Sequence, residues 1–217
     1  HRDLHSFPTR RSSDLEGEGK DDGRAQKRFM DEAELMAQLD HPFIIKIYDV
    51  GQAEGRTFLA MEFVEGQNLD QLIKDKSERI ADLAEMLMKV AQAVHYAHRK
   101  KIIHRDLKPS NIMVDRQHEP KVMDFGLARK IHRSQRFSKT GAVVGTLQYM
   151  SPEQAADPRA VDERSDVYSL GAILYEIMTG VPPFTGETAE NILYKIMAEE
   201  PLPRSEERRV GKECRSR

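Results

Sequence analysis

The chain has 217 residues and a formal charge of −2, with 39% hydrophobic and 32% charged residues. This composition is typical of one soluble globular domain and excludes a disordered chain, and the lack of any apolar run of about 18 residues excludes a membrane span. The near-neutral charge argues against binding to nucleic acid, and the only cysteine, Cys214, excludes an intrachain disulfide. We therefore expect a cytoplasmic location, with no nucleic-acid partner and no membrane contact from this segment.

Both ends of the chain are explained by a single DNA string. TCTTTCCCTACACGACGCTCTTCC encodes Ser6 to Ser13, and its reverse complement, read one base in, encodes Glu206 to Lys212. Because the string resembles a common sequencing adapter, residues 1–15 and 204–217 are predicted to be translation artefacts, and the alternative is a pair of native basic tails. Both ends are left out of the fold prediction.

The first native element is predicted to be a helix over Arg24–Leu39, which follows a polar linker at Glu16–Gly23. Four apolar residues at helical spacing support it: Phe29, Ala33, Met36 and Ala37. Gly17-Glu18-Gly19-Lys20 in the linker has the composition of a phosphate-binding loop. It lacks the spacing and a preceding strand, so we interpret it as linker.

A hairpin and two helices are predicted next. Phe43–Val50 and Thr57–Phe63 are β-branched or aromatic runs that flank a turn at Gly51–Gly55. Asn68–Lys74 is predicted to be a short helix and Ile80–Lys100 a long one. The long helix has one apolar stripe, which predicts a buried face: Leu83, Leu87, Val90, Val94 and Ala97.

Two histidines, His95 and His98, lie near the end of the long helix. They could form a metal pair, but no third ligand accompanies them, so packing or surface histidines are the favoured interpretation. Further along, Ile112–Asp115 and Pro120–Met123 are predicted strands. The last predicted elements are helices over Asp162–Thr179 and Ala189–Ala198.

The residues that indicate a chemistry lie between these elements. His104-Arg105-Asp106-Leu107-Lys108-Pro109-Ser110-Asn111 is followed, one short hairpin later, by Asp124-Phe125-Gly126. Transfer of a phosphoryl group from ATP to a hydroxyl requires a carboxylate that accepts the hydroxyl proton, which Asp106 can supply. It also requires oxygen ligands for magnesium, which Asn111 and Asp124 can supply.

The order and spacing of these motifs, followed by Ser151-Pro152-Glu153 and Asp166, resemble those of bacterial eukaryotic-like (Hanks-type) Ser/Thr protein kinases. The resemblance implies an α+β, bilobal kinase fold with residues 16–64 in an incomplete N-lobe and residues 65–203 in a C-lobe without its last helices. It also implies ATP and Mg²⁺ as cofactors, and proteins with Ser or Thr hydroxyls as substrates.

The same resemblance implies roles for individual residues. Asp106 accepts the proton, Lys108 stabilises the transferring phosphate, and Thr146 hydrogen-bonds near both of them. Asn111 and Asp124 bind Mg²⁺. Five residues are expected to support the site structurally: His104, Arg105, Phe125, Glu153 and Asp166.

The nucleotide is expected to lie against the second strand of the hairpin. Met61 corresponds to the gatekeeper, and backbone groups of Glu62 and Val64 are offered to adenine, with Met113 also in the nucleotide site. Glu32 matches the helix C glutamate that pairs with a strand lysine, and the alternative for Glu32 is a solvated helix carboxylate.

An internal spine and a regulatory segment are also implied. Met36, Ile47, His104 and Phe125 are expected to stack from one lobe to the other, and ordinary core packing is the bland alternative. The activation segment runs from Asp124 to Glu153, and Ser138 and Thr140 in it are predicted to be phosphorylated, with Arg105 and Arg129 as the arginine partners.

The sequence also departs from the family pattern. A glycine-rich loop and a Val-Ala-x-Lys strand should precede Glu32, but counting back reaches the excluded segment near Ser13. The polypeptide is therefore predicted to be inactive, and Glu153 is predicted to lack its arginine partner. One alternative to a protein kinase is a pseudokinase-like docking module. Another is a small-molecule phosphotransferase, but such enzymes typically lack the Lys108 and Ser-Pro-Glu patterns.

Overall fold

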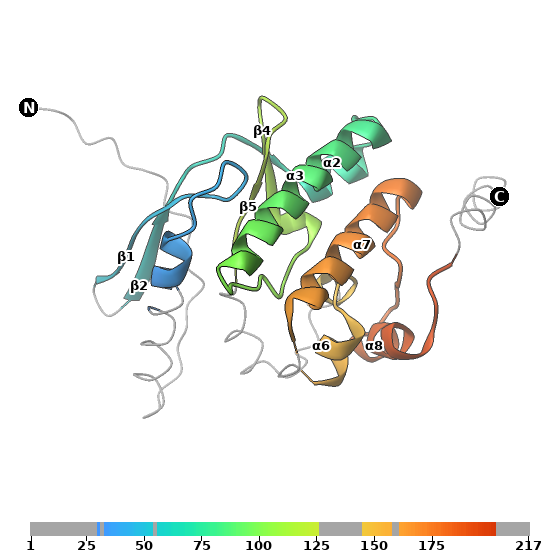
Figure 1. Cartoon of the computed structure of the whole chain (residues 1–217). Coiled ribbons are helices and arrows are strands. Elements are labelled where there is room, and N and C mark those ends of the chain that lie inside the picture. The colour runs from blue at the N-terminus through green and yellow to red at the C-terminus, as the bar shows by residue number, and fades with distance from the viewer. Residues whose placement is uncertain (1–29, 31–32, 54–55, 126–144, 158–160, 203–217) are drawn as a thin grey trace, which may run out of the picture.

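In the computed structural model of the chain, the described residues are 30, 33–53, 56–125, 145–157 and 161–202 (Figure 1). A β-hairpin lies on one side of a long central helix, and three further helices lie on the other side (Figure 1). The predicted α+β class is confirmed.

The hairpin consists of β1 (Ile47–Ala53) and β2 (Arg56–Met61), which pair antiparallel. The hairpin prediction is confirmed, but the predicted turn is too long, because Gly51 pairs with Phe58 inside the ladder. A Cβ on Gly51 would lie 2.6 Å from the ring of Phe58. The glycine thus makes room for an aromatic ring across the strands, and does not form the turn.

A second sheet has the order β3–β4–β5, with β3 at Gly66–Asn68, β4 at Ile112–Asp115 and β5 at Pro120–Val122. Both strand pairs are antiparallel. Gly66 is required where β3 meets β4, because a Cβ there would lie 1.9 Å from the carbonyl oxygen of Val114. The chain before β1 also touches this sheet, through a parallel bridge between Ile44 and Val122.

Two helices follow β3. α2 (Leu69–Asp75) begins at Asn68, whose side chain forms a capping box with Gln71. α3 (Ile80–Arg99) buries one stripe of apolar residues, which confirms the predicted face: Leu83, Met86, Leu87, Val90, Ala93, Val94 and Ala97.

The end of α3 directs the chain into the loop that carries the first sequence motif. The backbone N–H of Ile102 donates to the carbonyl of Ala97, and that of Lys101 donates to His98. Lys101 has a left-handed backbone with φ of 63°. This pattern is a Schellman motif, which ends the helix and reverses the direction of the chain.

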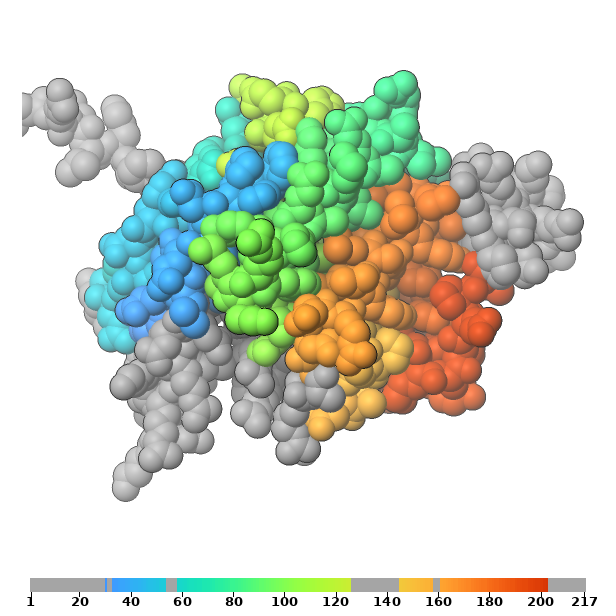
Figure 2. Space-filling view, viewed as in Figure 1, coloured from blue at the N-terminus to red at the C-terminus, as the bar shows by residue number. Residues whose placement is uncertain are grey.

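Three helices complete the described fold: α6 (Pro152–Ala156), α7 (Glu163–Thr179) and α8 (Ala189–Ala198). α7 packs against α3, and α6 packs against α8. In the space-filling view the green residues of α3 lie between the blue N-terminal segment and the orange α7 (Figure 2). Among the described residues, no helix has both the length and the apolar character needed to cross a bilayer.

The apolar core runs continuously from the hairpin to α7. Met36, Ile47, Val90 and Ile173 belong to one buried cluster, so the small strands and the large helices share a single core. A smaller cluster formed by Leu147, Phe184, Ile192 and Ile196 holds α8. Between these parts lies the loop from His104 to Asn111.

Candidate active site

The loop between α3 and β4 begins at His104, which is fully buried. The Nε2 atom of His104 lies 3.0 Å from the carbonyl oxygen of Met123, and its Nδ1 accepts from the backbone N–H of Asp106 at 3.3 Å. A carbonyl can only accept and a backbone N–H can only donate, so this ring is the neutral tautomer that carries its hydrogen on Nε2.

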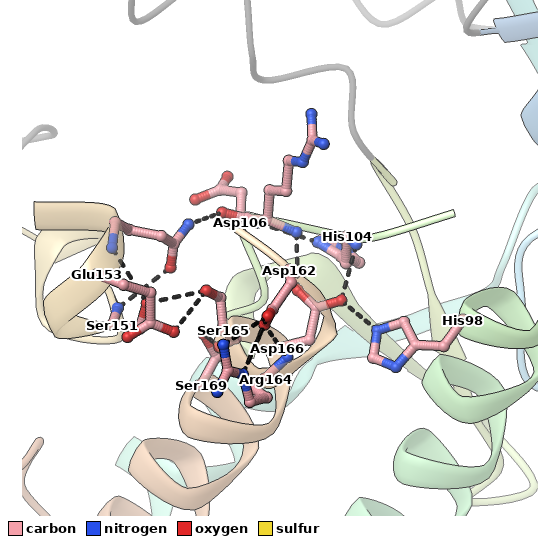
Figure 3. Close-up of polar contacts among 12 residues, drawn as sticks. His98, His104, Asp106, Ser151, Glu153, Asp162, Arg164, Ser165, Asp166 and Ser169 are labelled. Atoms are coloured by element: carbon pink, nitrogen blue, oxygen red, sulfur yellow. Dashed lines mark hydrogen bonds and ion pairs between the residues drawn. The ribbon is translucent and has the colours of Figure 1, made fainter. Parts of the chain in front are cut away.

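Asp166 holds the backbone of this loop from α7. Its Oδ2 accepts from the N–H of His104 and its Oδ1 from the N–H of Arg105, both at 2.8 Å. His98 Nε2 lies 2.6 Å from the same Oδ2 (Figure 3). Burial alone raises the pKa of the Asp166 carboxyl, but the hydrogen bond from His98 and the neighbouring backbone donors lower it more, so its pKa lies below the ordinary value.

His98 therefore has a role that the sequence analysis did not find. It was interpreted as a packing or surface histidine, whereas its ring is largely buried against Asp166. No sequence signal links two residues that are 68 positions apart and are brought together by the packing of α3 on α7. His95, one turn earlier, is exposed as expected. Among the described residues no cluster of three metal-ligating side chains occurs.

Four polar side chains are linked by hydrogen bonds in the loop that Asp166 holds and next to it. Lys108 Nζ lies 2.8 Å from Oδ2 of Asp106 and 3.1 Å from Oγ1 of Thr146. Asn111 Nδ2 donates to the backbone oxygen of Asp106 at 2.8 Å and to its Oδ2 at 3.2 Å. The short 3₁₀ turn at Pro109–Asn111 brings the amide back over Asp106. The structure thus joins residues 106, 108, 111 and 146 in one cluster.

The residues expected to form a spine also lie together. The rings of His104 and Phe125 have their centroids 4.7 Å apart, and Phe125 is buried. Met36, Ile47 and Phe125 line a common cavity of about 10 Å³, roughly the space of one water molecule. Met61 and Asp124 also line this cavity. Met36, Ile47 and Phe125 belong to one buried cluster, and Phe125 contacts His104, so the four residues form one continuous packed row.

The segment after β2 is held by charges. The backbone N–H of Glu62 donates to the carbonyl of Lys46 at 2.8 Å, and its carboxylate pairs with Lys121 at 2.7 Å. The N–H of Glu62, one of the backbone groups expected to face adenine, is therefore engaged by the backbone of Lys46. Val64 lies partly buried two residues further on, and Met113 lies partly buried in β4.

α6 connects the site to α7 through a chain of hydroxyl groups. Ser151 Oγ donates to Ser165 Oγ at 3.1 Å, and Ser165 Oγ donates to Oε1 of Glu153 at 2.7 Å. Burial raises the pKa of Glu153, but the hydrogen bond from Ser165 and other donors lower it below its ordinary value overall. The absence of an arginine partner for Glu153 stays a prediction, and within the described residues Ser165 on α7 supplies a donor to its carboxylate.

Some predicted site residues lie outside the described part of the chain. These are Glu32, Ser138, Thr140 and Arg129. Gln154 is a site residue that was not predicted, and its Nε2 donates to the carbonyl oxygen of Arg105 at 2.8 Å. The spacing of Ser151 and Gln154 is a sequence signal for a helix cap. Contact with Arg105 depends on the tertiary structure.

Comparison with known sequences decides the family. A family model described as protein kinase domain matches residues 15–215. The chain belongs to the protein kinase family. The match includes residues 204–215, so their assignment to a translation artefact stays a prediction.

Individual kinases are also similar to this one. The chain is 44% identical over 184 residues to the serine/threonine-protein kinase PknB of Mycobacterium leprae and to that of Mycobacterium tuberculosis. It is 43% identical over 184 residues to PknB of Mycolicibacterium smegmatis. Each alignment covers 82% of this chain and 29% of the relative, so this kinase chain spans less than a third of the length of these proteins.

Proposed function

We propose that the protein is an ATP-dependent Ser/Thr protein kinase that transfers the γ-phosphate to protein hydroxyls. The observation that carries the proposal is the cluster of Asp106, Lys108, Asn111 and Thr146, which combines a carboxylate, an ammonium group, an amide and a hydroxyl within hydrogen-bonding distance. The relatives' names, which specify serine and threonine, support the same class of substrate hydroxyl.

Asp106 is proposed to accept the proton of the substrate hydroxyl. At the same time the hydroxyl oxygen bonds to the γ-phosphorus, and the bond between that phosphorus and the leaving ADP oxygen breaks. Lys108, whose Nζ is 2.8 Å from Asp106, places a positive charge beside the phosphoryl oxygens during this transfer. Thr146 fixes the Lys108 ammonium by accepting at 3.1 Å. Asn111 orients the Asp106 carboxylate through its amide hydrogens.

The donor set also fits magnesium. The NH₂ group of Asn111 is bonded to Asp106, so its amide oxygen is the atom that remains for a cation. Together with the Asp124 carboxylate it forms a hard oxygen pair, and Mg²⁺ is usually held by one or two protein oxygens plus substrate phosphates. Bound Mg²⁺ would neutralise the phosphate charge. Adenine is proposed to lie between Met61 and Met113, against the backbone of Glu62 and Val64.

The 217-residue polypeptide itself is proposed to be nearly inactive. The printed sequence has no glycine-rich loop and no Val-Ala-x-Lys strand before Glu32. Loss of one preorganised electrostatic donor typically costs on the order of 10² to 10³ in rate, and here a lysine and several backbone donors are missing together.

A paired kinase assay tests the proposal. The chain as printed is compared with a version completed by the N-terminal strands and C-terminal helices of a PknB relative, with ATP, Mg²⁺ and a basic protein substrate. Transfer is expected only from the completed version, and Asp124→Ala or Asp106→Asn should abolish it. Robust transfer by the printed chain would contradict the proposed inactivity. No transfer by the completed version would favour the docking module.

Ser138 and Thr140 are proposed sites of autophosphorylation in the active kinase. A phosphate carries about −1.5 to −2 charges, which arginines such as Arg105 and Arg129 can bind and thereby order the segment. Phosphopeptide mapping of the active protein should find both sites. Full activity in the Ser138→Ala, Thr140→Ala double variant, together with no phosphate at either residue, would refute the proposal.

A further inference from the structure

The side chain of Gln154, in α6, contacts two different parts of the site. Its Oε1 accepts from the backbone N–H of Ser151 at 3.1 Å, and its Nε2 donates to the carbonyl oxygen of Arg105 at 2.8 Å. An N–H can only donate and a carbonyl can only accept, so these partners set the orientation of the amide. Both ends of one side chain are therefore used, one in the helix cap and one in the catalytic loop.

The carbonyl that Gln154 binds belongs to an unusual stretch of backbone. Arg105 has a φ of 66°, in the left-handed region that non-glycine residues rarely adopt. Its N–H is held by Asp166, and its carbonyl is held by Gln154. The next N–H in the chain, that of Asp106, donates to His104. The peptide unit joining residues 105 and 106 is thus held at both its oxygen and its nitrogen.

Hydrogen bonds join the start of α6, which carries Gln154, to α7. Ser151, which caps α6, is completely buried and donates to Ser165 on α7, the residue next to Asp166 (Figure 3). Ser165 in turn donates to Glu153. The helix that carries Gln154, α6, is therefore hydrogen-bonded to α7, the helix whose Asp166 holds the N–H of Arg105.

We infer that Gln154 is a positioning residue for phosphoryl transfer. By holding the Arg105–Asp106 peptide from the side of α6, it fixes the direction in which the Asp106 carboxylate leaves the backbone and couples the end of the activation segment to the catalytic loop. The inference rests on the function proposed above. It differs from a purely structural role, in which Gln154 would serve only to cap α6.

The chain contains a matched control for the capping role. Gln71 occupies the same position in α2, where Asn68 and Gln71 form the same reciprocal capping box. Within the part of the chain that the structure describes, the hydrogen bonds of Gln71 stay inside this cap. A glutamate at either position keeps the acceptor that the cap needs and carries a charge that the N-terminus of a helix favours.

Gln154→Glu therefore removes only the donor to Arg105 and places a carboxylate oxygen against its carbonyl. In the completed kinase we expect Gln154→Glu to lower kcat by about 10-fold to 100-fold, as a displacement of reacting groups by about 1 Å does, with the KM for ATP unchanged. Gln71→Glu should leave both constants unchanged. A wild-type kcat in Gln154→Glu, or an equal loss in both variants, would overturn the inference.

A second measurement uses the 217-residue chain and needs no activity. Amide hydrogen exchange of the peptide covering His104 to Lys108 should be faster in Gln154→Glu than in wild type, with α6 still protected and with no change in Gln71→Glu. Unchanged exchange in the catalytic loop, or loss of protection confined to α6, would overturn the inference. If the completed wild-type kinase transfers no phosphate, the proposed function fails, while this comparison still decides whether Gln154 holds the loop.

Discussion

Removal of the Asp166 side chain should strongly destabilise the described fold. Its carboxylate has no solvent exposure and accepts from two backbone N–H groups and from His98. Asp166→Ala leaves both backbone donors buried without a partner. At about 1–3 kcal/mol for each orphaned donor, the expected loss is roughly 2–6 kcal/mol of unfolding free energy. A typical domain has only about 5–15 kcal/mol in total.

Asp166→Asn should destabilise the fold about half as much as Asp166→Ala. An asparagine has a single acceptor oxygen, so whichever way its amide is turned, its NH₂ group faces one of the two backbone donors. One donor is orphaned instead of two, and the expected loss is about 1–3 kcal/mol, plus the strength that the negative charge gave to the remaining bonds.

Urea unfolding of the 217-residue chain at pH 7, followed by circular dichroism, measures these losses. Asp162→Asn is the control, because Asp162 caps the same α7 helix from an exposed position and asparagine caps equally well. Its unfolding midpoint should match that of wild type. The reasoning is refuted if Asp166→Ala unfolds at the same urea concentration as Asp162→Asn, or if Asp166→Asn is as unstable as Asp166→Ala.

Three further predictions concern buried polar contacts and pH. His98→Ala removes a bond to a buried carboxylate and should cost about 1.5–3 kcal/mol of unfolding free energy in urea, whereas the exposed His95→Ala should cost nothing measurable. The pKa of Asp166 lies below its ordinary value of 3.8. The stability that the ionised carboxylate contributes is therefore present above pH 3.8 and is lost as the pH falls through the folded-state pKa. When the unfolding free energy is measured at decreasing pH, it should fall more steeply in wild type than in Asp166→Asn. Burial raises the pKa of Glu176 above 4.5 despite the hydrogen bond from Tyr149 at 2.7 Å. The stability contributed by the protonated carboxyl is therefore fully present below pH 4.5 and is lost as the pH rises through the folded-state pKa. Glu176→Gln should therefore be more stable than wild type at pH 8 and equally stable at pH 4, and equal stability at pH 8 would contradict the assignment.

The sequence by itself determined most of the helices and strands and indicated the chemistry of the site. The apolar stripe of α3 has a helical period, and α8 has the predicted bounds, Ala189–Ala198, because local apolar spacing specifies both helices. The types and order of Asp106, Lys108, Asn111 and Asp124 indicated phosphoryl transfer, since few reactions need a carboxylate, an ammonium group and an oxygen pair at this spacing.

Only the tertiary structure decided which side chains hold the site residues in position. His98, Ser165 and Gln154 are ordinary polar residues in their local sequences, and each acquires its contact when helices distant in the chain pack together. The extent of the β1–β2 hairpin was also set by a ring packed across the strands at Gly51, and not by the turn-forming tendency of glycine. Local sequence sets backbone preference and side-chain type, whereas a hydrogen bond across many residues depends on the burial that brings both partners together.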